Sequence, residues 1–194
     1  MPFTLAAPVH SELLIKKSRF LGCVEPVTGR EQALARVQEL WAEHPGARHV
    51  CWALLAGGHS AAHDDGEPGG TAGRPMLEVL RHQDLEGVLA TVVRYFGGVK
   101  LGAGGLVRAY TDSVARALDS AERIPLLRMR TLTVEVDYPS EGVVRRELDA
   151  HGAALEDVQH AAGVTMVFQV AEDRADALIA RIADATSGRA VWGS

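Results

Sequence analysis

The feature that most limits how this chain can fold is an apolar run at residues 87–96, GVLATVVRYF, followed directly by a glycine-rich turn. The run is nearly continuous and rich in valine, which is typical of a central strand buried on both faces of its sheet. After the turn, apolar side chains recur every four positions, which predicts a helix of about twenty residues: Leu106, Tyr110, Val114 and Leu118. The segment therefore predicts a central strand, a tight turn and a helix in succession.

Further strands and helices are expected before this segment. In chain order they are two short extended segments around Lys16, an amphipathic helix over 30–43, a strand over 49–56 and a short helix over 74–82. Residues 57–73 are rich in glycine and have no apolar periodicity, so they predict a long loop. Loops longer than about 12–15 residues are usually functional or disordered, which makes this one a candidate site.

A second unit is predicted after Pro125, because proline cannot continue the preceding helix. From there the pattern indicates a strand over 131–137, a helix over 140–151, two strands over 153–160 and 164–170, a further helix and a short last strand. Asp173 is expected to cap that last helix. This β-α-β-β-α-β order is the split βαβ, ferredoxin-like arrangement. We therefore expect an α+β protein with one domain over 1–125 and another over 126–194.

Composition excludes several functional classes. The 194 residues carry a net charge of -5, which argues against binding nucleic acid over the whole surface but permits a local basic patch. No apolar run approaches the roughly 18 residues needed to span a bilayer, so no membrane association is expected. The positive charges near the N-terminus follow the short apolar stretch, which is the reverse of a signal peptide, and a cytoplasmic protein is predicted.

The two cysteines, Cys23 and Cys51, have apolar flanks and do not form a CxxC pair, so we interpret both as buried free thiols. His49 and Cys51 lie two positions apart on the predicted strand and face the same side. No acid positioned to orient the histidine is visible nearby, so a core cysteine is favoured over a catalytic dyad.

The glycine-rich turn suits an anion. Glycine lets backbone N–H groups approach a ligand, and a helix N-terminus carries partial positive charge. The turn is neither a Walker A loop nor a dinucleotide-binding fingerprint, because their spacings are absent. We also expect Gly104 and Gly105 to tolerate no bulky side chain, because of positive φ or close backbone approach. The alternative is a tight turn whose glycines only serve packing. The anion or nucleic-acid-binding candidates in and around the turn are Arg74, Arg94, Gly97, Gly98, Lys100, Gly102, Gly104, Gly105 and Arg108.

The second candidate site is the acidic part of the long loop, Asp64, Asp65 and Glu67. With the neighbouring His59 and His63 these carboxylates could bind a divalent metal, but their spacing matches no known ligand pattern, and we predict neither a metal nor a cofactor. A general base is a further alternative. The structural interpretation is stronger, because aspartates in turns accept hydrogen bonds from nearby backbone N–H groups. As solvated loop residues, Asp65 and Glu67 are expected to contribute little to fold stability.

Four blocks in the same order identify a family resemblance: KKSRFLG, ARHVCWALLAG, DDGEPGGTAGRPML and VVRYFGGVKLGAGGLVRAY, within residues 16–110. They resemble the signatures of the IMPACT family in its bacterial YigZ-like branch. The resemblance implies a first domain similar to the second domain of ribosomal protein S5, and a last domain similar to the fifth domain of elongation factor G. It also implies a link to translation, and it supplies no agreed catalytic residues.

Three functions stay open at this point. The favoured one is a non-enzymatic protein that docks on RNA, the ribosome or a translation factor. The alternatives are an enzyme acting on a phosphorylated or peptide substrate, with Asp64, Asp65 or Glu67 as base or metal ligand, and a pure protein-interaction module. We further predict that the acidic loop and the basic turn form one site, because Arg94 and Lys100 lie at one end of the sheet that the loop is long enough to reach.

Overall fold

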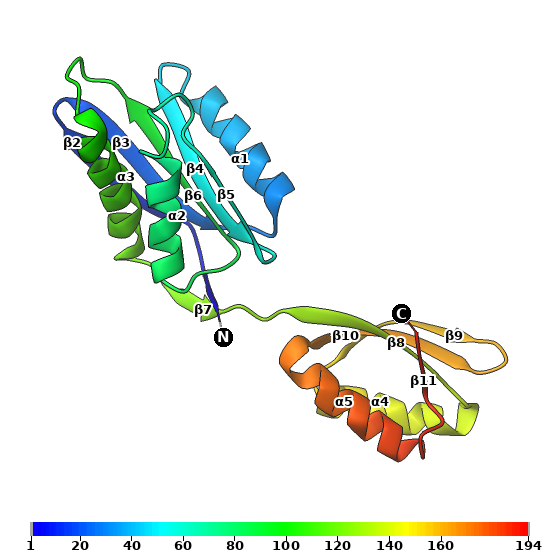
Figure 1. Ribbon diagram of the computed structural model, residues 1–194. Coiled ribbons are helices and arrows are strands. Elements are labelled where there is room, and N and C mark those ends of the chain that lie inside the picture. Colours follow the sequence, from blue (N-terminus) through cyan, green and yellow to red (C-terminus); the bar gives the residue numbers. More distant parts are fainter. Residues whose placement is uncertain (1, 194) are drawn as a thin grey trace. The chain divides into compact units, whose positions relative to one another are not determined.

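The computed structural model describes residues 2–193 and shows an α+β protein. Contacts divide the chain into two compact units, one up to Leu126 and one from Leu127 on (Figure 1), and each has its own antiparallel sheet and its own core. No helix among these residues is long and apolar enough to cross a membrane.

The first unit is built on a five-stranded sheet in which every neighbouring pair is antiparallel. The predicted central strand, β6 (Val88–Tyr95), is the middle strand, and its first seven residues are buried. The strand order is β2 (Val9–Ile15), β3 (Ser18–Pro26), β6, β4 (His49–Ala56) and β5 (His59–His63). The near-continuous apolar sequence of β6 follows from this position, because both of its faces are covered.

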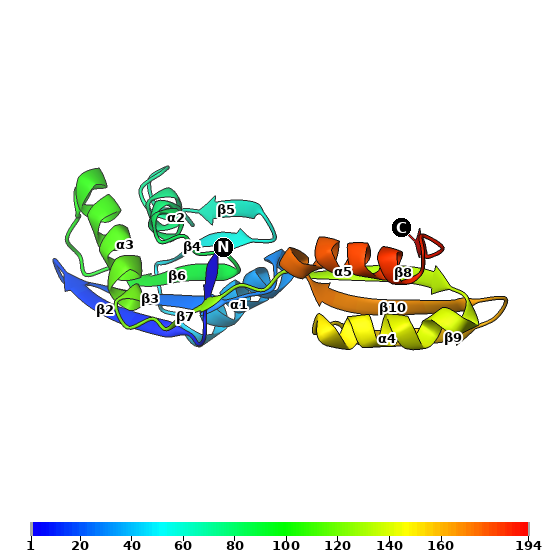
Figure 2. The same cartoon turned by 90° about the horizontal axis from the view of Figure 1, so that it is seen from below.

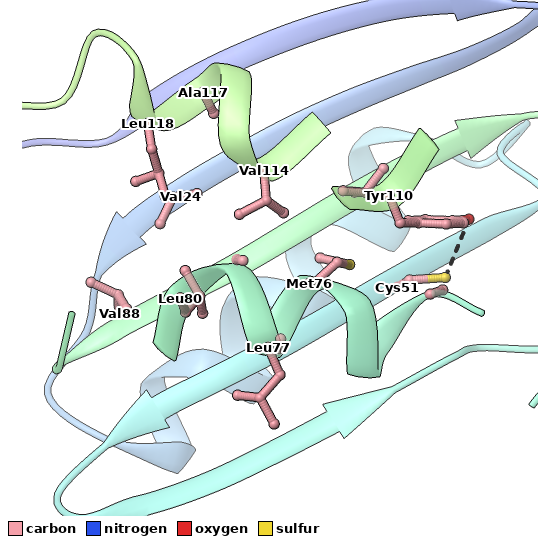
Figure 3. Close-up of a cluster of buried hydrophobic side chains, with 14 of the residues drawn as sticks. Val24, Cys51, Met76, Leu77, Leu80, Val88, Tyr110, Val114, Ala117 and Leu118 are labelled. Carbon is pink, nitrogen blue, oxygen red and sulfur yellow. Dashed lines mark hydrogen bonds between the residues drawn. The ribbon is translucent and has the colours of Figure 1, made fainter. Parts of the chain in front are cut away.

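Helices cover the two faces of this sheet (Figures 1 and 2). Helix α1 (Arg30–Glu43) packs on one face, and α2 (Gly73–His82) and α3 (Gly102–Leu118) pack on the other. Figure 3 shows the core beneath α2 and α3, with Tyr110, Val114 and Leu118 of α3 labelled. All four residues predicted for the apolar stripe of α3 are buried. Val114 and Leu118 meet side chains of α2 and of the sheet there, including Val24, Met76, Leu80 and Val88.

The prediction of one continuous loop over 57–73 is wrong in part, because β5 occupies His59–His63 and pairs with β4. This edge strand is mostly exposed, so its sequence, HSAAH, shows no apolar alternation. Backbone pairing and the stacking of His63 on Trp52 hold it in place. The irregular segment is therefore only residues 64–72.

A small two-stranded sheet closes the first unit and was not predicted. It pairs β1 (Phe3–Leu5) with β7 (Arg123–Pro125). Three residues are too few to produce a recognisable alternation, and only tertiary pairing reveals these strands.

The second unit has the predicted β-α-β-β-α-β order, and Figure 1 shows both of its long helices on one face of its sheet. The sheet order is β11-β8-β10-β9, antiparallel throughout. Its elements are β8 (Met129–Val136), a 3-10 turn η1 (Tyr138–Ser140), α4 (Glu141–Ala150), β9 (Ala154–His160), β10 (Val164–Ala171), α5 (Glu172–Ala185) and β11 (Val191–Gly193).

The predicted cap of the last helix is wrong. Helix α5 begins at Glu172, so Asp173 lies inside its first turn, and the flanking Ala171 offers no side-chain cap. Glu172 and Asp173 both lie near the positive end of the helix dipole, where carboxylates are stabilising.

Candidate functional site

The irregular segment 64–72 is shaped by its first carboxylate. Asp64 Oδ1 accepts hydrogen bonds from the backbone N–H groups of Ala72 and Gly73 at 3.1 and 2.9 Å, and its Oδ2 accepts one from Gly70 at 2.8 Å. Burial raises the pKa of Asp64, but the three N–H donors outweigh it and hold the pKa below its usual value. Asp64 therefore folds the segment back to the start of α2, and the structural interpretation of this aspartate is confirmed.

The next carboxylate ties the same segment to the sheet. Asp65 Oδ2 accepts a hydrogen bond from the backbone N–H of Val50 at 2.7 Å, and its carbonyl oxygen lies 2.7 Å from Nδ1 of His49. Asp65 also has φ +46°, a left-handed conformation that aspartate adopts more readily than most residues. Both aspartates are thus used to position backbone rather than being free in solvent.

Cys51 is a core thiol. Its Sγ lies 3.0 Å from the carbonyl oxygen of Asp64 and 3.4 Å from the hydroxyl of Tyr110, the contact dashed in Figure 3. Burial raises the pKa of this thiol far above its usual value, so it stays protonated. Cys23 is also a buried free cysteine, and the prediction of two buried free thiols is confirmed. The hydrogen bonds of Cys51 within residues 2–193 do not include one to His49, which disfavours the dyad.

Glu67 is the centre of the site. Its side chain is only 3 % exposed, and Oε1 accepts hydrogen bonds from Arg94 Nη1 at 2.6 Å and from the Tyr110 hydroxyl at 2.7 Å. Burial, together with Cys51 and Glu67, raises the pKa of Tyr110, which stays a donor. The other oxygen, Oε2, lies 3.7 Å from Nε2 of His49. The expectation that Glu67 is a solvated loop residue is wrong, because its side chain is a buried member of an ion pair.

The guanidinium group of Arg94 lies near two aromatic rings and a hydroxyl group. Its Cζ lies 5.4 Å from the ring centroid of Phe20 and 5.6 Å from that of Phe96, and Nη2 lies 3.3 Å from the hydroxyl of Ser18. Nε is the single buried side-chain nitrogen or oxygen within residues 2–193 that has no hydrogen-bond partner. The side chain is 6 % exposed, so this donor is shielded from bulk water.

The glycines of the turn divide into two groups. A Cβ on Gly97 would collide with the backbone carbonyl of Lys17, while Gly98 and Gly102 have φ of +86° and +75°. A Cβ on Gly104 would meet no described atom within 4 Å, and this glycine has no left-handed φ, so the predicted demand at Gly104 is wrong. A Cβ on Gly105 would lie 3.1 Å from Leu101 Cβ, which is tighter than an ordinary van der Waals contact. Gly104 and Gly105 lie in the first turn of α3 and not in the loop.

These elements enclose a pocket of about 350 Å³ at the start of α3. Among the described residues, Glu67 is the one carboxylate that lines it. Arg48 and Lys100 also line it, are exposed, and have no ion-pair partner among the described residues. The exposed ring of Phe96 and the buried side chain of Leu106 also line the pocket. The remaining lining residues are His49, Pro68, Arg94, Leu101, Gly102 and Ala103.

The structure brings some of the predicted residues together and separates others. Glu67 of the acidic loop and Arg94, Lys100 and Gly102 of the basic turn line one pocket. Arg74 lines a different groove, between α2 and α3, and Arg108 is exposed on α3 outside this pocket.

Sequence reasoning missed several members of the site: Arg48, Phe96, Tyr110 as a polar group, and His49 in contact with the acidic loop. The strand register would have indicated that His49 belongs to the site. Arg94 on β6 pairs with His49 on β4 and with Phe20 on β3, so the three residues are neighbours in the sheet. Tyr110 was assigned to the apolar stripe of α3, which is correct for its ring but leaves its hydroxyl unexplained. Over residues 2–193, no three His, Cys, Asp or Glu side chains are grouped to hold a metal ion.

Comparisons with known proteins place both units. The Impact N-terminal domain matches residues 16–118, and a domain of unknown function, DUF1949, matches residues 134–189. IMPACT family member YvyE of Bacillus subtilis is 36 % identical over 190 residues, which cover 96 % of this chain and 88 % of that protein. IMPACT family member YigZ of Escherichia coli is 43 % identical over 138 residues, 69 % of this chain and 68 % of that one. A crystal structure of a hypothetical protein has a TM-score of 0.78 and 34 % identity, covering 98 % of this chain and 95 % of its own.

We predict that Asp64→Asn destabilises the chain in a pH-dependent way. An amide keeps one acceptor and turns its NH₂ toward a backbone donor, which should cost about 1–3 kcal/mol at pH 7. Because the pKa of Asp64 is lower in the folded chain than in the unfolded one, its stabilisation is present above the unfolded value, about 3.9, and is lost as the pH falls through the folded value. Urea unfolding of both proteins should therefore show a difference that shrinks below about pH 4. A difference independent of pH contradicts this role.

Alanine substitutions at Gly97 and at Gly104 should have opposite effects on the free energy of unfolding. Gly97→Ala pushes a methyl group into backbone that cannot move aside, so we expect a loss of more than about 2 kcal/mol in the free energy of unfolding. Gly104→Ala adds a methyl group in open space on a helix and should be neutral or stabilising by up to about 1 kcal/mol. Denaturant unfolding of both variants checks this, and equal effects at the two positions would refute the division.

Proposed function

The chain belongs to the IMPACT family, and from this membership and the pocket at the start of α3 we propose that it is a translation-linked protein that binds single-stranded RNA. The RNA is proposed to be part of the ribosome or of a complex with a translation factor. The pocket is the contact point.

The observation that most supports RNA binding is the unpaired positive charge at the pocket. Arg48 and Lys100 are exposed and unpaired among the described residues, whereas Glu67 is already neutralised by Arg94. The chain as a whole has a net charge of -5, so this is a local excess of positive charge on an acidic protein. Local cations beside a helix N-terminus are a general means of binding phosphate groups.

An exposed aromatic ring favours a nucleic acid over a simple anion. Phe96 is 48 % exposed and lines the pocket with the two cations. Proteins that bind single strands combine cationic grooves with aromatic rings on which bases stack, because every base offers a flat π-face. The Arg94 guanidinium lies over the Phe96 ring, with its Cζ 5.6 Å from the ring centroid.

We also propose the two finer fold likenesses that the family resemblance implies. The first unit would be similar to the second domain of ribosomal protein S5, and the second unit to the fifth domain of elongation factor G. The β-α-β-β-α-β order of the second unit supports the latter. Both likenesses are to proteins of translation, which agrees with the proposed RNA source.

The enzymatic alternative has less support. Asp64 and Asp65 accept hydrogen bonds from backbone N–H groups, and Glu67 is paired with Arg94, so none of the three is a free base or metal ligand. The salt dependence of the affinity distinguishes RNA binding from a pure protein-interaction module. Binding to phosphate groups releases counterions and weakens with salt, whereas a largely apolar contact does not.

The test is fluorescence anisotropy of a labelled single-stranded RNA with the full chain over a series of salt concentrations. We expect Lys100→Ala and Arg48→Ala each to weaken binding several-fold and to reduce the slope of log affinity against log salt by about 0.7 for each phosphate that is no longer bound. Two exposed cations outside the pocket, Arg74 and Arg108, provide matched controls as alanine variants and should change neither quantity.

Two results would contradict the proposal. One is binding that no salt concentration alters, which would indicate an interaction module. The other is equal loss in Lys100→Ala and Arg108→Ala, which would place the RNA outside the pocket. Melting temperatures of all four variants are measured alongside, and they should stay unchanged because each side chain is exposed.

A further inference from the structure

The pocket at the start of α3 has features that specify its ligand more closely than single-stranded RNA, and the inference rests on the proposed function. A volume of about 350 Å³ lies at the lower end of the range for small-ligand sites, roughly 300–1,000 Å³. The buried Leu106 and the buried Glu67–Arg94 pair form part of its wall. A space of this size accommodates one nucleotide rather than several.

The start of α3 has unfilled hydrogen-bond donors. Leu101, the residue before α3, offers no side-chain cap to the helix. The first turn of α3 contains no acidic residue. The first N–H groups of a helix have no intrahelical acceptor, so Gly102 and Ala103 present donors at the pocket wall. Independently, Arg94 lines the same pocket with a 6 % exposed side chain whose Nε has no partner. An anion at this point would face a helix start and the two unpaired cations of the pocket, Arg48 and Lys100.

The number of unpaired charges fits a terminal phosphate. Arg48 and Lys100 supply two positive charges that no described carboxylate neutralises, and the helix start adds to them. A phosphate within a strand carries one negative charge, but a phosphate monoester carries about -1.5 to -2 at pH 7 and has three acceptor oxygens. The monoester matches the two cations and the uncapped N–H groups.

Glu67 in the pocket wall offers an acceptor for a sugar hydroxyl. Glu67 Oε2 accepts no hydrogen bond from any described residue, although Oε1 accepts two. It lies 3.7 Å from Nε2 of His49, and both residues line the pocket. A carboxylate oxygen can accept a hydrogen bond from a ribose hydroxyl, and the 2′-hydroxyl is what distinguishes RNA from DNA.

We propose that this pocket binds the terminal nucleotide of an RNA that ends in a phosphate monoester. The phosphate lies at the start of α3 with Lys100 and Arg48, the base stacks on the exposed ring of Phe96, and a ribose hydroxyl donates to Glu67 Oε2. The chemistry is shared by a 5′-phosphate, a 3′-phosphate and a free nucleotide, and the experiment separates these sources.

The experiment measures the affinity of the full chain for RNA oligonucleotides of one sequence that carry a 5′-phosphate, a 3′-phosphate or hydroxyls at both ends. We expect one of the phosphorylated forms to bind at least about tenfold more tightly than the hydroxyl form. Lys100→Ala and Arg48→Ala should abolish that preference, and Arg108→Ala should retain it. An oligonucleotide with a 2′-deoxy sugar at the terminal position alone should bind several-fold more weakly.

Each failure has a distinct meaning. Equal, salt-dependent affinity for all ends overturns the terminal-phosphate inference and leaves the proposed RNA binding intact, while no binding to any RNA overturns both. Equal affinity for the deoxy end refutes the role of Glu67. If adenosine 5′-monophosphate displaces the RNA at the same concentration as the unlabelled oligonucleotide, the ligand is a free nucleotide and the RNA end is excluded.

Phe96 provides an independent variant. Phe96→Tyr keeps an aromatic ring and should preserve binding, whereas Phe96→Leu should weaken every RNA several-fold, since the base loses its stacking partner. Far-ultraviolet circular dichroism and the melting temperature verify that both variants are folded. Equal affinity of the Tyr and Leu variants would exclude base stacking at this position.

Discussion

The buried ion pair between Glu67 and Arg94 is the interaction on which the first unit's site depends. It joins three segments that are far apart in sequence: the loop after β5, the end of the central strand β6, and α3 through the hydroxyl of Tyr110. Removing one partner of a buried pair costs about 3–5 kcal/mol, because the remaining charge is left desolvated. The pair is thus a structural requirement, and it also neutralises the one carboxylate among the described residues of the pocket, which leaves Arg48 and Lys100 as its net charge.

The same pair explains why the acidic loop contains three carboxylates. Asp64 and Asp65 organise the backbone of the loop, one toward α2 and one toward β4, and Glu67 enters the core, where its Oε1 accepts hydrogen bonds from both Arg94 and Tyr110. The glycines of the basic turn also differ in what they contribute. Gly97, Gly98 and Gly102 permit the chain path between β6 and α3, whereas Gly104 fulfils no such requirement.

Periodicity in the sequence predicted most of the fold, because long elements have strong patterns. The apolar run of β6 indicated a central strand, and the four-residue repeat in α3 identified its buried face. Strands β1, β5 and β7 were missed for physical reasons: two are three residues long, and β5 is an exposed edge strand whose side chains need not alternate.

The site was predictable only in outline. The sequence places carboxylates and cations on two loops, and their meeting at one end of the sheet follows from the position of β6. Which carboxylate is buried does not follow, because burial of Glu67 depends on its tertiary contacts with Arg94 and Tyr110. Arg48 and Phe96 were missed because a single exposed cation and a single aromatic residue have no periodic signal.

A double-mutant cycle on Glu67 and Arg94 tests the central claim, that one buried ion pair holds the acidic loop and the basic turn together. Free energies of unfolding are measured for the wild type, Glu67→Gln, Arg94→Gln and the double variant. We predict a coupling energy of about 2–3 kcal/mol, with the double variant losing much less than the sum of the single losses, because no unpaired charge remains in it. Single losses that add to within about 0.5 kcal/mol would contradict the claim, since additivity is the behaviour of independent sites.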